Sequence, residues 1–290
     1  MRESVMSPEN PSQTAAPRHV DAHAHILEEP EIAAAMIHHC EGLGIGAFFL
    51  GGYDPDDWDR QLRLREKFGN RIQMSFGLHP WFVHNASGEV CREAFHKLES
   101  RLTTRPGHTG MMPSAIGETG LDHALATDKQ DRERQLDWFR RHLRLAGKLG
   151  MPVVLHVVKA HGACLRELHA HPGTTGLVHA FRGEKNLIVE YARLGMLLSI
   201  GPNGVAGMSR ENLATIPDRI LVIESDAPTG AIGARERGSS QIKPAHITPA
   251  VIIEVAEKVA LARGKGETAG AILDLSRENL SRVFQIAVPG

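Results

Sequence analysis

Two histidines near the start of the chain have a spacing that suits metal binding. Residues 20–25 read VDAHAH, which places His23 and His25 two positions apart. Side chains alternate between the two faces of a strand, so these imidazoles point the same way and can hold one ion together. In a chain with 17 histidines the pair is weak evidence by itself, because both could be polar residues of a loop.

Further histidines and carboxylates lie toward the ends of short apolar runs later in the chain: His79, Glu118, Asp122, His156, His179 and Asp226. Each has a plainer interpretation as well, since His79 could cap a loop, Glu118 could form a salt bridge, and a lone histidine is usually a core residue. Glu224 competes with Asp226, because both face the same way along a strand. As a set, these groups exceed what one tetrahedral zinc needs and suit two divalent ions with a bridging carboxylate.

Eight short apolar runs could position these groups. Each run is too short for a typical helix and is rich in Val, Ile, Leu and Phe, as buried parallel strands are. The runs cover residues 19–25, 45–52, 72–80, 114–122, 151–156, 175–181, 195–202 and 219–228.

The segments between these runs have helical periodicity. The clearest is 130–149, which carries one apolar stripe and is followed by Gly150 and then Pro152. Residues 184–194, 248–263 and 276–284 are similar, with Ser276 as the expected N-cap of the last helix.

Eight strands alternating with helices over about 250 residues predict an α/β fold, the (β/α)8 TIM barrel. The rival is an open doubly wound sheet, and its dinucleotide-binding form loses support because no GxGxxG follows the first strand. We expect one domain over 19–290, preceded by a flexible tail over 1–18, and a long loop over 229–247. In a barrel the C-terminal strand ends share one face, so the histidines and carboxylates converge.

The composition narrows the class of protein. The chain has 290 residues, 42% of them hydrophobic and 23% charged, with a net charge of −1. There is therefore no global basic field for nucleic acid, and a polyanion must be held by metal or by a few local cations. Three well-separated cysteines suit a reducing cytoplasm, and no apolar run reaches the length of about 18 residues that spans a membrane. No obligate protein partner is evident.

In order along the chain, the stretches DAHAH, GLHPW, IGETGLD, PVVLH, LVHAFRG, LSIGPNG and LVIESDAP, with SRENLSRVF near the end, resemble the TatD family of metal-dependent hydrolases. This family is a branch of the amidohydrolase-like barrels, and the resemblance runs from about residue 19 to 285. It implies one or two divalent ions, and we expect two (Mg²⁺, Mn²⁺ or Zn²⁺). His23, His25 and Asp226 would bind the first, and His156 and His179 the second. Glu118 would bridge them, and His79 would contact the scissile phosphate.

The resemblance implies a deoxyribonuclease, often a 3′-to-5′ exonuclease on single-stranded DNA, with Asp226, Glu118 and His79 as catalytic residues. Hydroxide from metal-activated water would attack phosphorus, and Asp226 would accept the proton. The alternative is a D-aminoacyl-tRNA deacylase or another ester or amide hydrolase, because activated hydroxide does not by itself distinguish phosphorus from carbon. A scaffold that has lost catalysis is a third hypothesis, and the complete ligand set opposes it.

Two departures from the family pattern bear on the substrate. In HVVKAHG, Lys159 falls one position later than the usual arginine, and HAFRG stands where HCFSG is common, so Arg182 could supply the missing charge. Trp81 and Phe82 could stack on a base or pack beneath a loop, and packing is the favoured interpretation.

Overall fold

Eight parallel strands form the centre of the protein. The computed structural model describes residues 18–103, 111–227 and 248–286, which excludes nearly all of the expected tail and the loop over 229–247. Each strand pairs with the next in chain order. The strands are β1 His19–Ala24, β2 Ile45–Leu50, β3 Ile72–Phe76, β4 Ala115–Asp122, β5 Val153–Val158, β6 Gly176–Val178, β7 Leu197–Ile200 and β8 Leu221–Ile223. Every predicted run contains or overlaps one strand.

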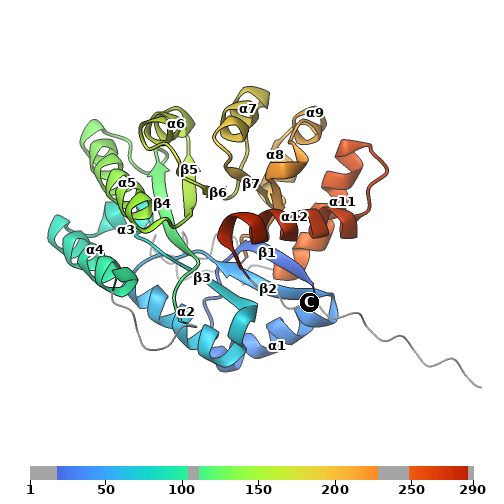
Figure 1. Cartoon of the computed structure of the whole chain (residues 1–290), viewed down its shortest axis with the longest axis horizontal. Coiled ribbons are helices and arrows are strands. Elements are labelled where there is room, and N and C mark those ends of the chain that lie inside the picture. The colour runs from blue at the N-terminus through green and yellow to red at the C-terminus, as the bar shows by residue number, and fades with distance from the viewer. Residues whose placement is uncertain (1–17, 104–110, 228–247, 287–290) are drawn as a thin grey trace, which may run out of the picture.

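Helices surround the strands (Figure 1). They are α1 Pro30–Gly42, α2 Pro55–Phe68, α3 Pro80–Asn85, α4 Gly88–Thr103, α5 Lys129–Leu149, α6 His161–Ala170, α7 Lys185–Arg193, α8 Pro202–Gly207, α9 Arg210–Ala214, α11 Ile252–Arg263 and α12 Ala269–Phe284. The predicted (β/α)8 TIM barrel is confirmed.

Hydrogen bonds beyond the end of β8 join the last strand to the first. The Asp226 N–H donates to the His23 carbonyl at 2.9 Å, and the His25 N–H donates to the Ala227 carbonyl at 2.7 Å. The buried Asp21 carboxylate accepts from the backbone N–H and the hydroxyl of Ser225. Residues about 200 positions apart in sequence are therefore neighbours where β8 meets β1.

The last helix begins earlier than the sequence suggested. It starts at Ala269, and the Thr268 side chain caps it by accepting the Ala271 N–H at 3.2 Å. The prediction of Ser276 as the N-cap is wrong. Ser276 is buried inside α12, where its hydroxyl accepts the Ile223 N–H at 2.9 Å and ties the helix to β8. The helix begins with the small residues AGA, which carry little amphipathic pattern. The sequence therefore indicated only the second half of this helix.

The other predicted helices are confirmed within a few residues. α5 ends at Leu149, and Gly150 follows in the left-handed conformation with φ of 64°. Residues 249–251 form one turn of 3-10 helix before α11 begins at Ile252. No helix among the described residues is both long and apolar enough to cross a membrane.

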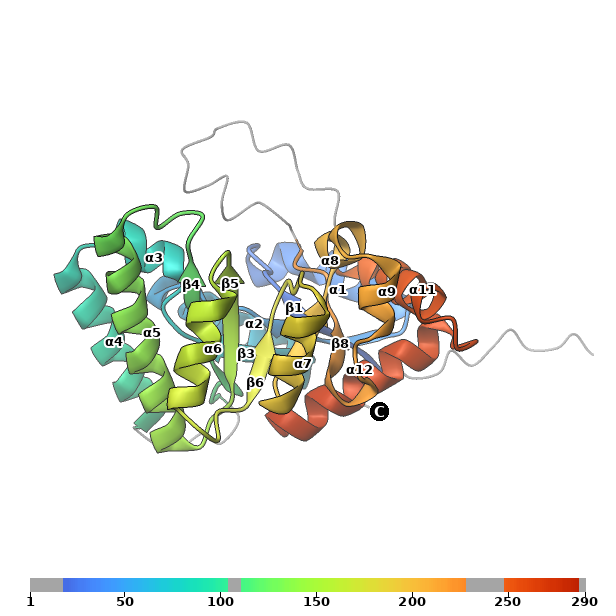
Figure 2. The same cartoon turned by 90° about the horizontal axis from the view of Figure 1, so that it is seen from above.

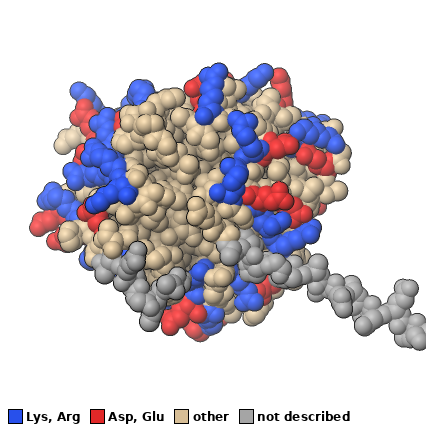
Figure 3. All heavy atoms as spheres, viewed as in Figure 1, with Lys and Arg blue, Asp and Glu red and all other residues tan. Residues whose placement is uncertain are grey.

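The strand ends that matter for chemistry lie on one side of the barrel. In Figure 2 β4 and β5 point toward the side on which α3 and α8 lie, and both of these helices directly follow strands. Figure 3, viewed as Figure 1, shows the opposite side of the barrel, where lysines and arginines are interspersed with acidic residues around the rim.

A buried histidine of α5 fixes the segment after β3. His142 is fully buried, its Nε2 accepts the Leu78 N–H at 3.1 Å, and its Nδ1 donates to the Trp138 carbonyl at 2.7 Å. Leu78 immediately precedes His79, so this bond helps to place the turn that carries a predicted site residue.

Burial lowers the pKa of His142 to about 4 from 6.5. Between these values the unfolded chain binds a proton that the folded chain does not. The contribution of neutral His142 to the free energy of unfolding is therefore fully present above pH 6.5 and is lost as the pH falls toward 4. We expect the metal-free protein to lose about 2 kcal/mol of this contribution between pH 7.5 and pH 5. Urea unfolding of wild type and His142→Gln at both pH values measures it; equal pH dependence in the two proteins would contradict the assignment.

Candidate metal centre

Glu118 lies at the centre of a buried cluster of imidazoles. It is in the middle of β4 and is fully buried. Its Oε1 lies 3.6 Å from Nε2 of His23 and 3.5 Å from Nε2 of His25. His25 Nε2 lies 3.6 Å from Oδ1 of Asp226, which is at the more open edge of the cluster. One oxygen of Glu118 thus faces the residues contributed by β1 and by the segment after β8.

The second oxygen of Glu118 faces three other histidines. Oε2 lies 2.7 Å from Nε2 of His179, 3.7 Å from Nδ1 of His156 and 3.7 Å from Nε2 of His79. His179 directly follows β6, His156 is within β5, and His79 comes three residues after β3. The expected convergence of strand-end side chains is present in the structure, with Glu118 between its two halves.

The spacing of the nitrogen atoms suits shared ions. His23 Nε2 and His25 Nε2 are 3.2 Å apart, and His156 Nδ1 and His179 Nε2 are 3.0 Å apart. Two nitrogen ligands at about 2.0–2.1 Å from one tetrahedral zinc are themselves about 3.3–3.4 Å apart, so both pairs are within a few tenths of an ångström of that separation. Three sets of side chains bring their ligand atoms within 4.8 Å of one another: His23, His25 and Asp226; His23, Glu118 and His179; and His79, Glu118 and His156.

The polar atoms of the cluster lack sufficient partners of their own. Neither oxygen of Glu118 accepts a hydrogen bond of good geometry from the described residues, although His179 lies close to Oε2. A buried carboxylate without such partners is costly. Histidine nitrogens and carboxylate oxygens are the ligand types of zinc and related divalent ions. The residues present therefore fit a metal centre.

The two halves of the cluster differ in electrostatics. Burial lowers the pKa values of His23 and His25 to about 4, and the neighbouring imidazoles add to this effect. Burial also acts to lower the pKa of His179, but the charge of Glu118 outweighs it and raises that pKa to about 10. The metal-free protein therefore carries a proton on His179 near neutral pH, paired with Glu118, and this proton competes with a metal ion for the same nitrogen.

His79 serves both as a helix cap and as a member of the cluster. Its Nδ1 accepts the Trp81 N–H at 3.0 Å and thereby caps α3. A neutral imidazole whose Nδ1 accepts must carry its proton on Nε2, which is the nitrogen that faces Glu118. His79 thus presents a donor to the site, whereas a metal ligand would need a lone pair on that nitrogen.

Gly51, at the end of β2, leaves space for the cluster. A Cβ at this position would overlap the His23 ring and lie 2.6 Å from Glu118 Oε1. We expect Gly51→Ala to displace both side chains and to weaken Zn²⁺ binding at least about tenfold. Gly147→Ala is the matched control, because a Cβ there meets nothing within 4 Å. Zn²⁺ titration of both variants measures the effect, and unchanged affinity in Gly51→Ala would show that the packing is looser than the structure indicates.

Three residues considered from the sequence lie outside the cluster. Glu224 is fully buried, and its Oε1 accepts the Ala180 N–H at 2.6 Å, so it anchors the turn after His179. Asp226 is the one of the two competing carboxylates that faces the histidines. The side chains of Lys159 and Arg182 are exposed, and among the described residues no hydrogen bond or ion pair joins either of them to the cluster.

Aromatic side chains border the cluster next to His79. The Trp81 ring meets His79 edge-on at 5.4 Å, and the Tyr53 ring stacks on His79 at 5.1 Å. Phe82 meets Tyr53 edge-on at 6.5 Å. The Trp81 indole N–H donates to Asp122 at 2.7 Å. Sequence reasoning missed Tyr53 and the link between Trp81 and Asp122, because no local pattern relates residues 41 positions apart.

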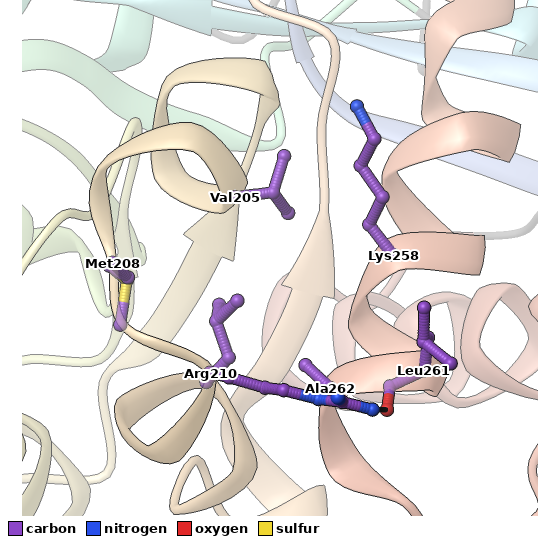
Figure 4. A pocket seen from close by; sticks show the side chains of 7 residues that line it. Val205, Met208, Arg210, Lys258, Leu261 and Ala262 are labelled. Atoms are coloured by element: carbon purple, nitrogen blue, oxygen red, sulfur yellow. Dashed lines mark hydrogen bonds between the residues drawn. The ribbon is translucent and has the colours of Figure 1, made fainter.

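A separate hollow lies between α8, α9 and α11 (Figure 4). Its volume is about 270 Å³, and Val205, Met208, Leu213, Leu261 and Ala262 line it together with Arg210 and Lys258. None of its lining residues belongs to the cluster around Glu118. Among the described residues, the groups of side chains that could hold a metal ion all lie in the cluster around Glu118.

Comparison with known proteins gives consistent results. The TatD related DNase family matches residues 20–285. The chain is 28% identical to the metal-dependent hydrolase YjjV of Escherichia coli over 73% of this chain and 80% of that protein. It is 30% identical to the 3′-5′ ssDNA/RNA exonuclease TatD of Musicola paradisiaca over 67% and 71%. The crystal structure of YjjV superposes with a TM-score of 0.77 at 23% identity, covering 93% of this chain and 99% of that one. The chain therefore belongs to the TatD related DNase family of metal-dependent hydrolases.

Proposed function

We propose that this protein is a divalent-metal-dependent deoxyribonuclease that removes nucleotides from the 3′ end of single-stranded DNA. The observation that carries the proposal is the placement of Glu118, whose two oxygens face two sets of histidines. The activity printed for the TatD relative, a 3′-5′ exonuclease, supports the choice of substrate and polarity.

Two ions fit the donor set. His23, His25 and Asp226 would hold one ion, His156 and His179 would hold the other, and Glu118, which faces both sets, would serve both ions. When bound, such ions lower the pKa of water and neutralise charge on phosphoryl oxygens. Mg²⁺ and Mn²⁺ favour the carboxylates, and Zn²⁺ favours the imidazoles, so each of these ions belongs in the test.

The protein side chains supply proton transfer and orientation. Asp226 lies at the open edge of the cluster, and burial raises the pKa of its carboxyl, which makes it a better proton acceptor than a surface aspartate. In the proposed reaction Asp226 takes a proton from the attacking water. His79 donates its Nε2 proton in a hydrogen bond to a phosphoryl oxygen as negative charge grows there. The leaving group is the 3′-oxygen of the preceding nucleotide.

The test uses metal-stripped protein and single-stranded DNA labelled at the 3′ or the 5′ end, with and without Mg²⁺, Mn²⁺ and Zn²⁺. The proposal expects metal-dependent release of mononucleotides from the 3′ end. Cleavage from the 5′ end would contradict the polarity. Absence of cleavage with every ion, in protein shown to bind metal, would contradict the nuclease activity.

A second candidate is hydrolysis of an ester, such as that of a D-aminoacyl-tRNA. It is favoured by the exposed Lys159 and Arg182, which stand near the family's usual positive position without contact to the cluster. Fewer cations beside the reacting group leave less to hold a scissile phosphate, while the centre that could activate water for attack on an ester carbonyl stays intact. Incubation with D-aminoacyl-tRNA and simple esters under the same metal conditions separates the two candidates.

A further inference from the structure

Trp81 donates two N–H groups to residues of the site, one to His79 and one to Asp122. Its backbone N–H donates to His79 Nδ1 at 3.0 Å. Its indole N–H donates to Asp122 Oδ2 at 2.7 Å, and the same oxygen lies 3.2 Å from His156 Nε2. One residue of α3 is thus linked directly to His79 and, through Asp122, to His156.

Asp122 is held so that it can only accept hydrogen bonds. Its Oδ1 accepts the backbone N–H groups of Ala124 at 2.9 Å and Leu125 at 3.1 Å. Its Oδ2 faces the two ring N–H groups of Trp81 and His156. The side chain is 5% exposed, and its hydrogen bonds to His156 and Trp81 overcome burial and hold the pKa of the carboxyl below its usual range. Four donors surround an ionised carboxylate, so the group cannot rotate without losing bonds.

This arrangement decides which nitrogen of His156 enters the cluster. With Nε2–H directed at Asp122, the lone pair of the neutral ring is on Nδ1. Nδ1 is the atom that faces Glu118 and His179. His23, His25 and His179 instead present Nε2. The Nδ1 atoms of His23 and His179 are buried and have no hydrogen-bond partner among the described residues.

We infer that Asp122, oriented by the indole of Trp81, is a positioning residue that selects the Nε2–H tautomer of His156 and aims Nδ1 into the metal centre. The inference deepens the proposed function and rests on its metal site. Carboxylates that hold the far nitrogen of a ligating histidine fix its ring and raise its basicity. No such carboxylate holds His23 or His179 in the described structure, so the metal binding of His156 depends on a distant partner in a way that theirs does not.

Asp122→Asn is the first test. The amide oxygen can still accept from Ala124 and Leu125, which leaves the NH₂ group facing the donors of Trp81 and His156. We expect His156 to move its proton to Nδ1 to avoid two opposed donors, as in other carboxylate–histidine pairs. Zn²⁺ affinity, measured by competition with a chromophoric chelator, should fall about 10- to 100-fold.

Trp81→Phe is the second test, because it removes the indole N–H and keeps the backbone N–H that binds His79. It should weaken Zn²⁺ binding less than Asp122→Asn does, while the His79 tautomer stays unchanged. Trp138→Phe, on α5 and packed against Phe95, is the matched control and should bind Zn²⁺ like the wild type. Thermal unfolding of each variant identifies any loss that comes from misfolding.

The tautomers are read from long-range ¹H–¹⁵N spectra of the metal-free protein with ¹⁵N-labelled histidine, at a pH high enough for neutral rings. An Nε2–H form of His156 in the wild type that becomes Nδ1–H in Asp122→Asn supports the inference. An unchanged tautomer with unchanged Zn²⁺ affinity overturns it. A wild type that binds no Zn²⁺, Mn²⁺ or Mg²⁺ would refute the proposed metal centre, and the spectra would still decide which proton Asp122 selects.

Discussion

Glu118→Gln is expected to abolish metal binding and activity while the barrel stays folded. Gln has nearly the same shape, but it removes the one negative charge that faces five imidazoles. It also places an NH₂ donor where a ligand oxygen stood. Loss of a group that only orients a metal ligand lowers metal affinity about 10- to 100-fold. We expect Glu118→Gln to lower Zn²⁺ affinity by more than this. Cleavage of single-stranded DNA should fall about 10³-fold or more.

The measurement is a Zn²⁺ titration together with the end-labelled DNA assay and thermal unfolding. Glu167→Gln is the matched control, because Glu167 is a largely buried carboxylate paired with Arg140 on the outer side of the barrel. That variant should keep its metal and its activity even if it loses some stability. Full Zn²⁺ binding by Glu118→Gln would remove Glu118 from the centre of the site.

Asp226→Asn is expected to lower the turnover number by about 10²- to 10⁴-fold and to leave the fold intact. Asp226 adopts a left-handed conformation with φ of 50°, which Asp and Asn both tolerate better than most residues do. The substitution therefore keeps the backbone and the bond from the residue 226 N–H to the His23 carbonyl. It removes the proton acceptor and one ligand oxygen.

The two substitutions should differ in how they act. Asp226 lies at the edge of the cluster beside His25, so its loss leaves the site around Glu118, His156 and His179 complete. Metal binding in Asp226→Asn should therefore weaken less than in Glu118→Gln, while activity is nearly lost in both. Single-turnover rates at saturating metal separate the two effects. Retention of most activity in Asp226→Asn would refute its role as the proton acceptor.

The sequence was sufficient to predict the barrel and the membership of the cluster. Eight short apolar runs alternate with amphipathic segments, and a parallel barrel brings all C-terminal strand ends to one face. This topology alone makes His23, His25, Glu118, His156 and His179 neighbours, because each is within or just after its strand. The plainer interpretation of His79 as a cap also holds. In the structure the same imidazole caps α3 with one nitrogen and faces the cluster with the other.

Other features depend on contacts between distant segments. Side-chain alternation did not separate Glu224 from Asp226, because two positions on the same face of a strand look alike until the backbone turns, and only the family resemblance pointed to Asp226. That turn occurs at Asp226, after β8 has ended, and it directs Glu224 to Ala180 and Asp226 to His25. The true start of α12 was missed for a related reason, since Ser276 is placed by its bond to β8 rather than by any capping role.

What the sequence by itself determined is which side chains gather, because strand order and side-chain alternation are properties of the chain's local pattern. What only the tertiary structure decided is which nitrogen each ring presents to the cluster and how each side chain is oriented. His156 offers Nδ1 because Asp122 holds its other nitrogen, and His79 offers a donor because the Trp81 N–H occupies its Nδ1. Gly51 provides the space for His23 because β2 passes beside β1. Tautomer, orientation and clearance are set by atoms that lie close in space and far apart in sequence.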